Sequence, residues 1–287
     1  MKFKNILITG SNGQLGSELK SLKSLISGAK LFFTDIDDLD ITDAASVKDF
    51  IVKNNIDLVI NCAAYTAVDK AEEDFDRAEL INALAPTIIA RILNEVGGKF
   101  IHISTDYVFD GKGFRPYTES DIPNPLGAYG NTKRSGEIAI KESGCDYIII
   151  RTSWLYSAFG SNFVKTIIRL AKERENLNVV ADQVGTPTFA EDLAKAVIAI
   201  ATGDKWINGV YHYSNEGVCS WFDFAKSIVE YSNLICEINP CSTKDYPTKA
   251  VRPFFSVLDK SKIKSTFNLV IPYWRDSLCI CISKLIS

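Results

Sequence analysis

Short apolar runs alternate with helix-like segments over the first half of the chain, and no other feature of the sequence constrains the fold as strongly. The runs read NILIT, KLFFT, DLVINC, KFIHIS and DYIIIR, and the segments between them have the period of amphipathic helices. Strands that are apolar almost throughout are typical of a parallel sheet that helices cover on both faces. The pattern therefore predicts an α/β fold built on a doubly wound parallel sheet.

Beyond Trp154 the alternation becomes less regular. Short strand-like runs such as NVV and VYHYS separate helical patterns at 162–174, 191–202 and 220–231. No internal repeat, low-complexity segment or long linker separates the two halves. We therefore expect a main domain at 1–155 and a smaller mixed α/β lobe at 156–287, with interleaved elements and a cleft between them. The final segment, VIPYWRDSLCICISKLIS, is expected to pack on its own lobe as a helix, with a partner surface as the alternative.

Charge and cysteine usage exclude several classes of function. The 287 residues carry a formal charge of −3 and contain no Lys/Arg block, so we expect no nucleic-acid partner. The N-terminus lacks the pattern of a signal peptide, and no apolar run has the length of a membrane span. Seven scattered cysteines show neither CxxC pairs nor metal-like spacing with the two histidines. These features predict a cytoplasmic protein with reduced thiols and no bound metal.

The first apolar run leads into the glycine-rich segment TGSNGQLGSEL. It places Gly10, Gly13 and Gly16 three residues apart before a helical pattern. Such glycines permit a tight turn, close approach of a pyrophosphate and close packing of helix on strand. The N–H groups and positive dipole at the start of the helix also favour phosphate. The spacing is GxxGxxG rather than GxGxxG, and glycines can also end strands for ordinary turn reasons, but the context favours a Rossmann-like dinucleotide site.

Asp35 ends the second apolar run and lies at a sequence distance typical of acids that bind an adenosine ribose. Together with Asp37 and Asp38, it would repel a 2′-phosphate, which favours NADH over NADPH. The alternative is that these loop carboxylates are only solvated. The expected cofactor is NADH or NADPH.

Tyr129 and Lys133 lie four residues apart in PLGAYGNTKRSGE, so on a helix they share one face. An ammonium and a nicotinamide cation would stabilise the phenolate and bring the pKa of the tyrosine toward working pH. Such a tyrosine can donate a proton to a carbonyl oxygen. The fourth apolar run also ends in Ser104 and Thr105, at the edge of the sheet where doubly wound folds bind ligands. The alternative is an ordinary surface pair.

The glycine loop, the Thr105 hydroxyl and the YxxxK pair together resemble the extended short-chain dehydrogenase/reductase superfamily. This resemblance implies that Thr105, Tyr129 and Lys133 are catalytic. It implies that Lys133 also binds the nicotinamide ribose and that Thr105 hydrogen-bonds the substrate oxygen.

A narrower resemblance covers nearly the whole chain. The segments NCAAYTAVDKAEED, STDYVFDGKG, YGNTKRSGE, RTSWLYSAFGSNFVKTIIRLAKE, VVADQVGTPT and KAVRPFFSVLD together resemble the dTDP-4-dehydrorhamnose reductase family. It implies reduction of the 4-keto group of dTDP-4-dehydro-β-L-rhamnose by NAD(P)H, the last step of dTDP-L-rhamnose synthesis. In these terms 1–155 is mainly the NAD(P)-binding Rossmann domain and 156–287 mainly the substrate-binding lobe.

The same resemblance assigns further site residues by position. For the cofactor it implies Gly10, Asn12, Gly13, Gln14 and Leu15 at the pyrophosphate, Asp35, Asp40 and Ile41 at the adenosine, Ala63, Ala64 and Tyr65 along the path to the nicotinamide, and Tyr129 with Lys133. For the sugar nucleotide it implies Thr66, Val68, Thr105, Asp106, Tyr107, Tyr129, Trp154 and Arg252.

Several of these residues have plainer interpretations. Trp154 can be a core aromatic rather than a platform for the sugar. Arg252 can pair with a surface carboxylate instead of the diphosphate that its guanidinium fork would match. The acidic segment DKAEEDFDRAE fits a helix that begins with acids and has a solvated face, rather than a metal site. His102 and His212 lie in strand-like runs and are interpreted as core histidines without a role.

Two rival functions share the expected fold. The first rival is a sugar-nucleotide dehydratase or epimerase, or a reductase of another nucleotide sugar. In the dehydratases a glutamate follows the Thr-Asp pair, and Tyr107 stands there in this chain, which favours simple reduction. The second rival is a non-catalytic binding subunit, such as the regulatory subunit of methionine adenosyltransferase, because fold alone does not prove activity. The presence of Thr105, Tyr129 and Lys133 together favours an enzyme. The base of the nucleotide rests on the resemblance alone, and a homodimer is one open oligomeric state.

Overall fold

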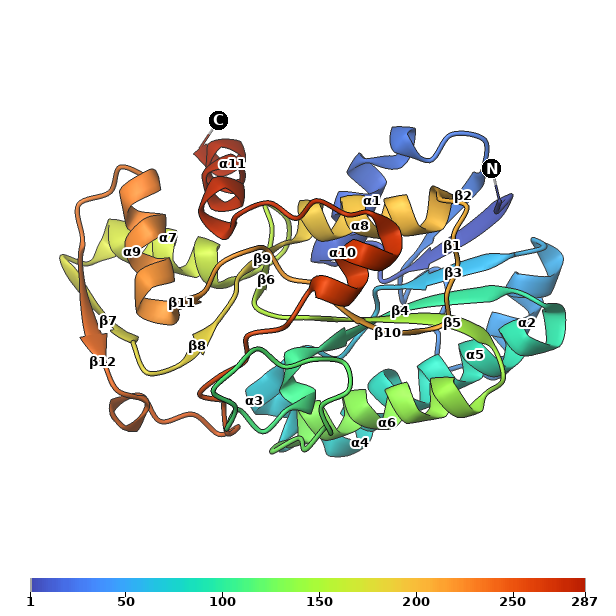
Figure 1. Ribbon diagram of the computed structural model, residues 1–287, viewed down its shortest axis with the longest axis horizontal. Coiled ribbons are helices and arrows are strands. Elements are labelled where there is room, and N and C mark those ends of the chain that lie inside the picture. Colours follow the sequence, from blue (N-terminus) through green and yellow to red (C-terminus); the bar gives the residue numbers. More distant parts are fainter. Residues whose placement is uncertain (1, 287) are drawn as a thin grey trace.

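A six-stranded parallel sheet forms the centre of the computed structural model, which describes residues 2–286 (Figure 1). Its strand order is β10-β5-β4-β3-β1-β2, and every neighbouring pair is parallel. The strands are β1 Asn5–Thr9, β2 Lys30–Thr34, β3 Leu58–Asn61, β4 Lys99–Thr105, β5 Asp146–Thr152 and β10 Gly209–His212. All five predicted apolar runs are strands, and the predicted doubly wound α/β fold is confirmed.

Helices cover both faces of this sheet because each strand is apolar on both sides. Ile6 and Ile8 of β1 pack into one core with helices α1 (Gln14–Ser21), α8 (Ala190–Thr202) and α10 (Ser261–Phe267). Leu7 packs into the other core with α2 (Ala44–Lys53), α5 (Ala85–Val96) and α6 (Ala128–Glu142). Figure 1 shows the first set above the sheet and the second below it. A short helix α3 (Val68–Ala71), a helix α4 (Phe75–Glu79) and a π-helical turn (Leu80–Leu84) precede α5.

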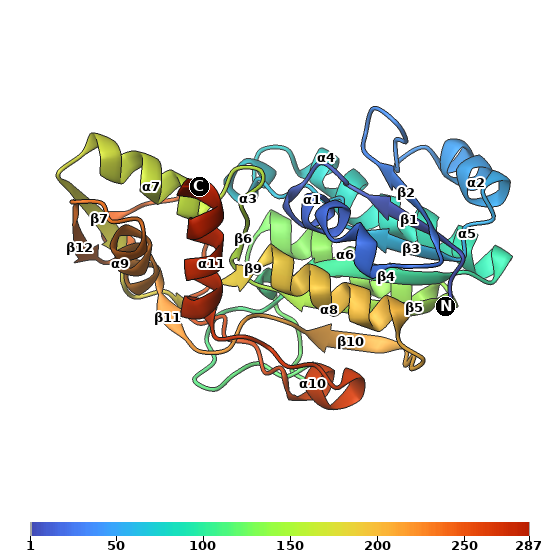
Figure 2. The same ribbon diagram turned by 90° about the horizontal axis from the view of Figure 1, so that it is seen from above.

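A second lobe has its own apolar core, and Figure 2 shows it beside the sheet. It contains helices α7 (Phe163–Glu173), α9 (Trp221–Tyr231) and α11 (Trp274–Ile286), and the parallel pair of β7 (Asn176–Val180) and β12 (Glu237–Cys241). Short strands complete it: β6 Leu155–Tyr156 with β9 Thr188–Phe189, and β8 Val184–Gly185 with β11 Cys219–Ser220. The helical patterns predicted for the second half are α7, α8 and α9, and the terminal helix α11 packs on its own lobe, as expected.

Parts of the second half return to the sheet. The run VYHYS becomes β10, which pairs with β5 at the edge of the sheet, and α8 packs against α1. The division of the chain near residue 155 therefore describes only the larger part of each half, and it stays a prediction. No helix among residues 2–286 combines the length and apolar character needed to cross a bilayer.

Candidate active site

A cleft of about 750 Å³ lies at the carboxyl ends of the sheet strands, against the second lobe. Its volume is within the range of pockets that hold small ligands and cofactors. The predicted residues that line it are Gly10, Gly13, Gln14, Leu15, Asp35, Asp40, Ile41, Ala63, Ala64, Thr66, Val68, Thr105, Asp106, Tyr107, Tyr129, Lys133, Trp154 and Arg252. Residues more than two hundred positions apart thus meet in one cavity.

Gly10 turns the chain sharply from β1 toward α1. Its φ is +64°, and a Cβ at this position would lie 2.6 Å from the backbone nitrogen of Ala63. Helix α1 then begins at Gln14 without a side-chain cap, so its first N–H groups are left for a ligand. Backbone in close approach and an uncapped helix start fit the pyrophosphate of a dinucleotide.

Replacing Gly10 by alanine is expected to weaken NAD(P)H binding by at least about tenfold, because strain and a backbone clash would move the loop. A tenfold loss of affinity corresponds to about 1.4 kcal/mol of binding free energy. Gly97→Ala is the matched control. Gly97 ends α5 with φ +73° and has open space around its missing Cβ, so its alanine variant introduces the strain without the clash. Fluorescence titration with NADPH measures the affinity of both variants. Equal affinities of Gly10→Ala and Gly97→Ala would contradict the assignment of the loop to the pyrophosphate.

Asp35 ties the glycine loop to the end of β2. Its Oδ2 accepts a hydrogen bond from the Asn12 N–H at 2.8 Å, and its Oδ1 accepts one from the Ile36 N–H at 2.9 Å. Asp35, Asp40 and Ile41 lie together on this side of the cleft. The carboxylate is therefore where the sequence predicts a partner for the adenosine ribose.

Two of the predicted cofactor-binding residues, Asn12 and Tyr65, do not line the cleft. Asn12 is exposed and contributes its N–H to Asp35. The Tyr65 hydroxyl donates to Asp74 at 3.1 Å, and its backbone N–H donates to the side chain of Asn82 at 2.9 Å. The Tyr65 hydroxyl is therefore bonded to Asp74, outside the cleft lining.

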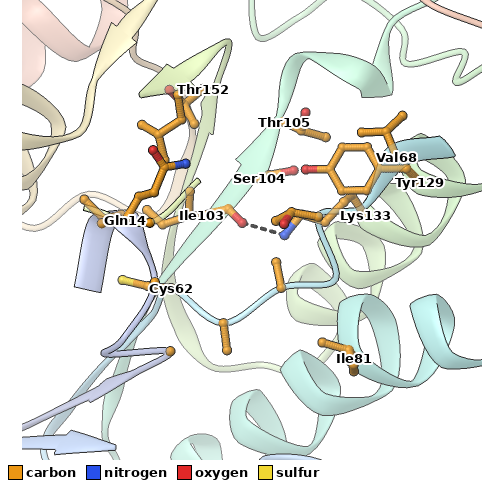
Figure 3. Close-up of a pocket in the computed structure, with 18 of the residues that line it drawn as sticks. Gln14, Cys62, Val68, Ile81, Ile103, Ser104, Thr105, Tyr129, Lys133 and Thr152 are labelled. Carbon is orange, nitrogen blue, oxygen red and sulfur yellow. Dashed lines mark hydrogen bonds between the residues drawn. The ribbon is translucent and has the colours of Figure 1, made fainter. Parts of the chain in front are cut away.

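Thr105, Tyr129 and Lys133 meet at the centre of the cleft. Thr105 ends β4, whereas Tyr129 and Lys133 lie one turn apart on α6. Figure 3 shows the Tyr129 hydroxyl pointing toward Ser104 and Thr105, with Lys133 beneath the ring. The three groups that the sequence predicts to be catalytic are therefore brought together.

Burial dominates the electrostatics of Tyr129 and Lys133. Burial raises the pKa of Tyr129 above its usual value, although the Thr105 hydroxyl acts in the opposite direction. The Nζ of Lys133 donates to the carbonyl oxygen of Ile103 at 2.6 Å, and burial lowers the pKa of Lys133 to about 8. The structure thus holds Tyr129 as a protonated phenol, which is the form that a proton donor requires.

The other end of the cleft holds Arg252. Its Nη1 donates to the Tyr107 hydroxyl at 3.0 Å, and its Nη2 donates to Asp69 at 2.6 Å. The sequence allowed a surface carboxylate as the partner of Arg252, and this carboxylate is Asp69. Arg252 nevertheless lines the cleft. Its guanidinium can reach both the carboxylate and a ligand in this cavity.

Trp154 lies in the cleft wall with a strained backbone, at φ +47°. Its ring stacks on Trp221 with centroids 3.5 Å apart and planes at 9°. Gly185 permits this position, since a Cβ there would lie 2.7 Å from the Trp154 ring. Backbone strain at a cleft is a common mark of a functional site, and here the second lobe sets the position of the aromatic wall.

Asp106 is a buried carboxyl beside the proposed proton donor. Its Oδ1 accepts from the Thr105 hydroxyl at 3.1 Å, and burial raises its pKa to about 6. Its other oxygen, Oδ2, is buried, and Asp106 itself lines the cleft.

The acids after Val68 have structural partners. Glu72 accepts a hydrogen bond from the Ala128 N–H at 2.8 Å and so caps the first turn of α6. Asp69 pairs with Arg252, and Glu73 pairs with Lys249. The predicted solvated acidic face is confirmed, because Glu72 and Glu73 are exposed and Asp69 is half-buried.

A buried ion pair anchors α6 to the sheet. Glu137 accepts two hydrogen bonds from Arg151, at 2.8 and 2.7 Å, and one from the Ser104 hydroxyl at 2.7 Å. Both charged side chains are almost fully buried. Tyr129 and Lys133 therefore sit on a helix fixed to β4 and β5.

Sequence reasoning missed several cleft residues at the end of β5, in the loop between β6 and α7, and in the second lobe. Asn162 donates to the side chain of Gln14 at 3.0 Å and links this loop to the start of α1. The missed lining residues include Thr152, Ser153, Gly160, Ser161, Asn162 and Trp221. Ser220 forms a capping box at the start of α9, and the helical pattern predicted at 220–231 already placed Trp221 at this helix end.

The sequence and the fold are similar to those of known proteins. The family described as RmlD substrate binding domain matches residues 4–287. The chain is 40% identical over 282 residues to the dTDP-4-dehydrorhamnose reductase of Escherichia coli K12, and the match covers 94% of each chain. A dTDP-4-dehydrorhamnose reductase structure from Clostridium acetobutylicum has a TM-score of 0.94 at 43% identity, over 99% of this chain and 100% of that chain. The one from Bacillus anthracis, in complex with NADP, has a TM-score of 0.92 at 39% identity, over 98% and 99%.

Proposed function

The chain belongs to the dTDP-4-dehydrorhamnose reductase family, and from this premise we propose which of its residues perform each part of the reaction. It is an NAD(P)H-dependent oxidoreductase that reduces the 4-keto group of dTDP-4-dehydro-β-L-rhamnose to give dTDP-β-L-rhamnose. The observation that carries the proposed roles is the meeting of Thr105, Tyr129 and Lys133 in the same cleft as the glycine loop.

The glycine loop and the start of α1 would hold the pyrophosphate, and Asp35 would face the adenosine ribose. When bound, NAD(P)H supplies the hydride that reaches C4 of the sugar. Ala63 and Ala64 would line the path toward Lys133, which would bind the nicotinamide ribose. The cofactor is thus proposed to lie along the carboxyl edge of the sheet.

Tyr129 is the proposed proton donor to the O4 oxygen of the sugar. Its buried phenol keeps the proton until negative charge develops on that oxygen. The Thr105 hydroxyl would hydrogen-bond the same oxygen and hold it near the phenol. Tyr129 would then recover its proton from solvent before the next turnover.

The sugar nucleotide would lie between these groups and the second lobe. Trp154 would offer an apolar face to the sugar ring, and Asp106 would border the sugar beside Thr105. Arg252 would exchange part of its contact with Asp69 for the diphosphate. Thr66, Val68 and Tyr107 complete this side of the cleft.

A screen of nucleotide 4-keto sugars with NADH and NADPH tests the proposed substrate. We expect the highest kcat/KM with dTDP-4-dehydro-β-L-rhamnose. Binding of nucleotides without any turnover would instead support a non-catalytic binding subunit. Elimination of water is not expected, because Tyr107 follows Thr105 and Asp106 and carries no carboxylate.

Asp35 is expected to disfavour NADPH, because a 2′-phosphate would approach its carboxylate. Asp35→Asn should therefore raise kcat/KM for NADPH relative to NADH, measured by nucleotide oxidation at saturating sugar. Asp49→Asn, an exposed carboxylate of α2 outside the cleft lining, is the control. An unchanged ratio in Asp35→Asn would remove this account of cofactor preference.

The domain roles, location and assembly complete the proposal. The glycine loop supports a mainly NAD(P)-binding part at 1–155, and Trp221 in the cleft wall supports a mainly substrate-binding part at 156–287. Free cysteines at all seven positions support the cytoplasm. The exposed side chains of Phe114 and Ile122 offer apolar surface for a homodimer, which light scattering would measure.

A further inference from the structure

His102 lies in the middle of β4, and its ring faces the Lys133 amine. The proposed mechanism gives it no role. His102 and Asn61 of β3 are 0% exposed, and Lys133 is 1% exposed. The Nζ of Lys133 lies 3.3 Å from Nε2 of His102. Both ring nitrogens face fixed groups, so the neighbours determine which nitrogen carries the proton.

Asn61 fixes one side of the ring. Its Oδ1 accepts hydrogen bonds from the Thr9 hydroxyl at 2.6 Å and from the Ala63 backbone N–H at 3.1 Å. A backbone N–H can only donate, which sets the orientation of the amide and turns its Nδ2 toward Nδ1 of His102, at 3.1 Å. The amide nitrogen donates, so Nδ1 accepts and carries no proton.

The ring proton is therefore on Nε2 and faces Lys133. The ring is neutral, because burial lowers the pKa of His102 well below 6.5. An ammonium group has three donors and no acceptor, whereas an uncharged amine has a lone pair. The contact between Nε2 and Nζ is thus a hydrogen bond only when Lys133 is uncharged.

We propose that His102 is a positioning residue that holds the Lys133 amine and favours its uncharged form. Lys133 would then gain and lose its proton near neutral pH instead of remaining a permanent cation. This inference rests on the proposed function only where it assigns Lys133 to the catalytic site. The protonation states themselves are properties of the folded chain.

The other titratable groups near Lys133 are consistent with this assignment. Cys62 follows β3, and burial raises the pKa of its thiol to about 12, so it carries no charge. Tyr129, on the same helix, is a neutral phenol. Glu137 favours the ammonium, but its carboxylate is bonded to Arg151 and Ser104. Burial outweighs it and lowers the pKa of Lys133 to about 8.

His212 provides an internal contrast, because the chain has only two histidines. Its Nδ1 lies 3.0 Å from the carbonyl oxygen of Tyr117, and its Nε2 lies 3.4 Å from Nη1 of Arg151. A carbonyl accepts and a guanidinium donates, so His212 carries its proton on Nδ1. The two histidines are expected to be opposite tautomers.

Nitrogen NMR of protein labelled with 15N-histidine tests this expectation on the unmodified chain. We expect one histidine protonated at Nε2 and one at Nδ1, both neutral at pH 7. His102→Gln and His212→Gln assign the two sets of signals. An Nδ1 proton on His102, or a cationic ring, would overturn the proposal whether or not the variants fold.

Titration of Lys133 tests the consequence. In protein labelled at lysine 13Cε, the signal absent from Lys133→Met is expected to titrate near pH 8. His102→Gln places a carbonyl that can accept from the ammonium, and should raise this midpoint by about one pH unit. His212→Gln should leave it unchanged. A wild-type midpoint near the usual lysine value, or one that His102→Gln does not move, would contradict the role of His102. Neither measurement needs turnover, so an enzyme inactive on the sugar would refute the proposed function alone.

Discussion

Tyr129→Phe is expected to lower kcat by at least about a hundredfold, the lower end for loss of a positioned acid. Phenylalanine keeps the ring but removes the proton that reduction of the sugar oxygen requires. The rest of the cleft is unchanged, so NADPH and the nucleotide sugar should still bind. Steady-state kinetics with dTDP-4-dehydro-β-L-rhamnose and fluorescence titration with NADPH measure the two effects separately.

Tyr147→Phe is the matched control for this variant. Tyr147 lies near the start of β5, at the end of the strand away from the cleft, and does not line the cavity. Its kcat should equal that of the wild type. If Tyr129→Phe also retained full kcat, the proton would come from another group, and the assignment of Tyr129 would be wrong.

Glu137→Leu is expected to reduce the free energy of unfolding by about 3–5 kcal/mol, because it leaves the buried Arg151 guanidinium without its partner. Urea unfolding followed by circular dichroism measures the loss. The double variant Glu137→Leu with Arg151→Met should recover much of it, since no charge then remains buried. A single variant as stable as the wild type would show that the ion pair does not anchor α6.

Glu173→Leu is the control for ion-pair loss at the surface. Glu173 pairs with Arg169 on α7, and both side chains are more than half exposed. Exposed pairs contribute about 0–1 kcal/mol, so the change should be small. The comparison separates the effect of burial from that of charge pairing alone.

The Glu137 contribution also has a defined pH dependence. The Arg151 ion pair and the hydrogen bonds from Ser104 and Arg134 lower its pKa from 4.5 to about 2, against the effect of burial. A lowered folded-state pKa stabilises the protein fully above the unfolded value and loses this effect as pH falls through the folded value. The stability difference between the wild type and Glu137→Leu should therefore shrink between pH 4.5 and 2.

The sequence predicted those features that depend on short-range pattern. Each apolar run became a strand, because consecutive side chains such as Ile6 and Leu7 enter opposite apolar cores. The glycine loop and the Tyr129 and Lys133 pair were also visible, since their spacing within a few residues determines their geometry. These local signals were enough to place the cofactor half of the cleft.

Contacts between distant segments could not be predicted in the same way. Asn162 and Gln14 are 148 positions apart, and Arg252 and Asp69 are 183 apart. The Nζ of Lys133 and its acceptor, the carbonyl of Ile103, are 30 positions apart. Tyr65 was misplaced because Asp74 and Asn82, both later in the chain, bind its hydroxyl and backbone N–H.

Transfer of deuterium from a deuterated cofactor to the sugar tests the central claim most directly. The enzyme would be incubated with dTDP-4-dehydro-β-L-rhamnose and NADPH that carries deuterium at the transferable position. We predict that NMR of the product shows deuterium at C4 of dTDP-β-L-rhamnose. Bound cofactor without product, or deuterium at any other carbon, would contradict the account.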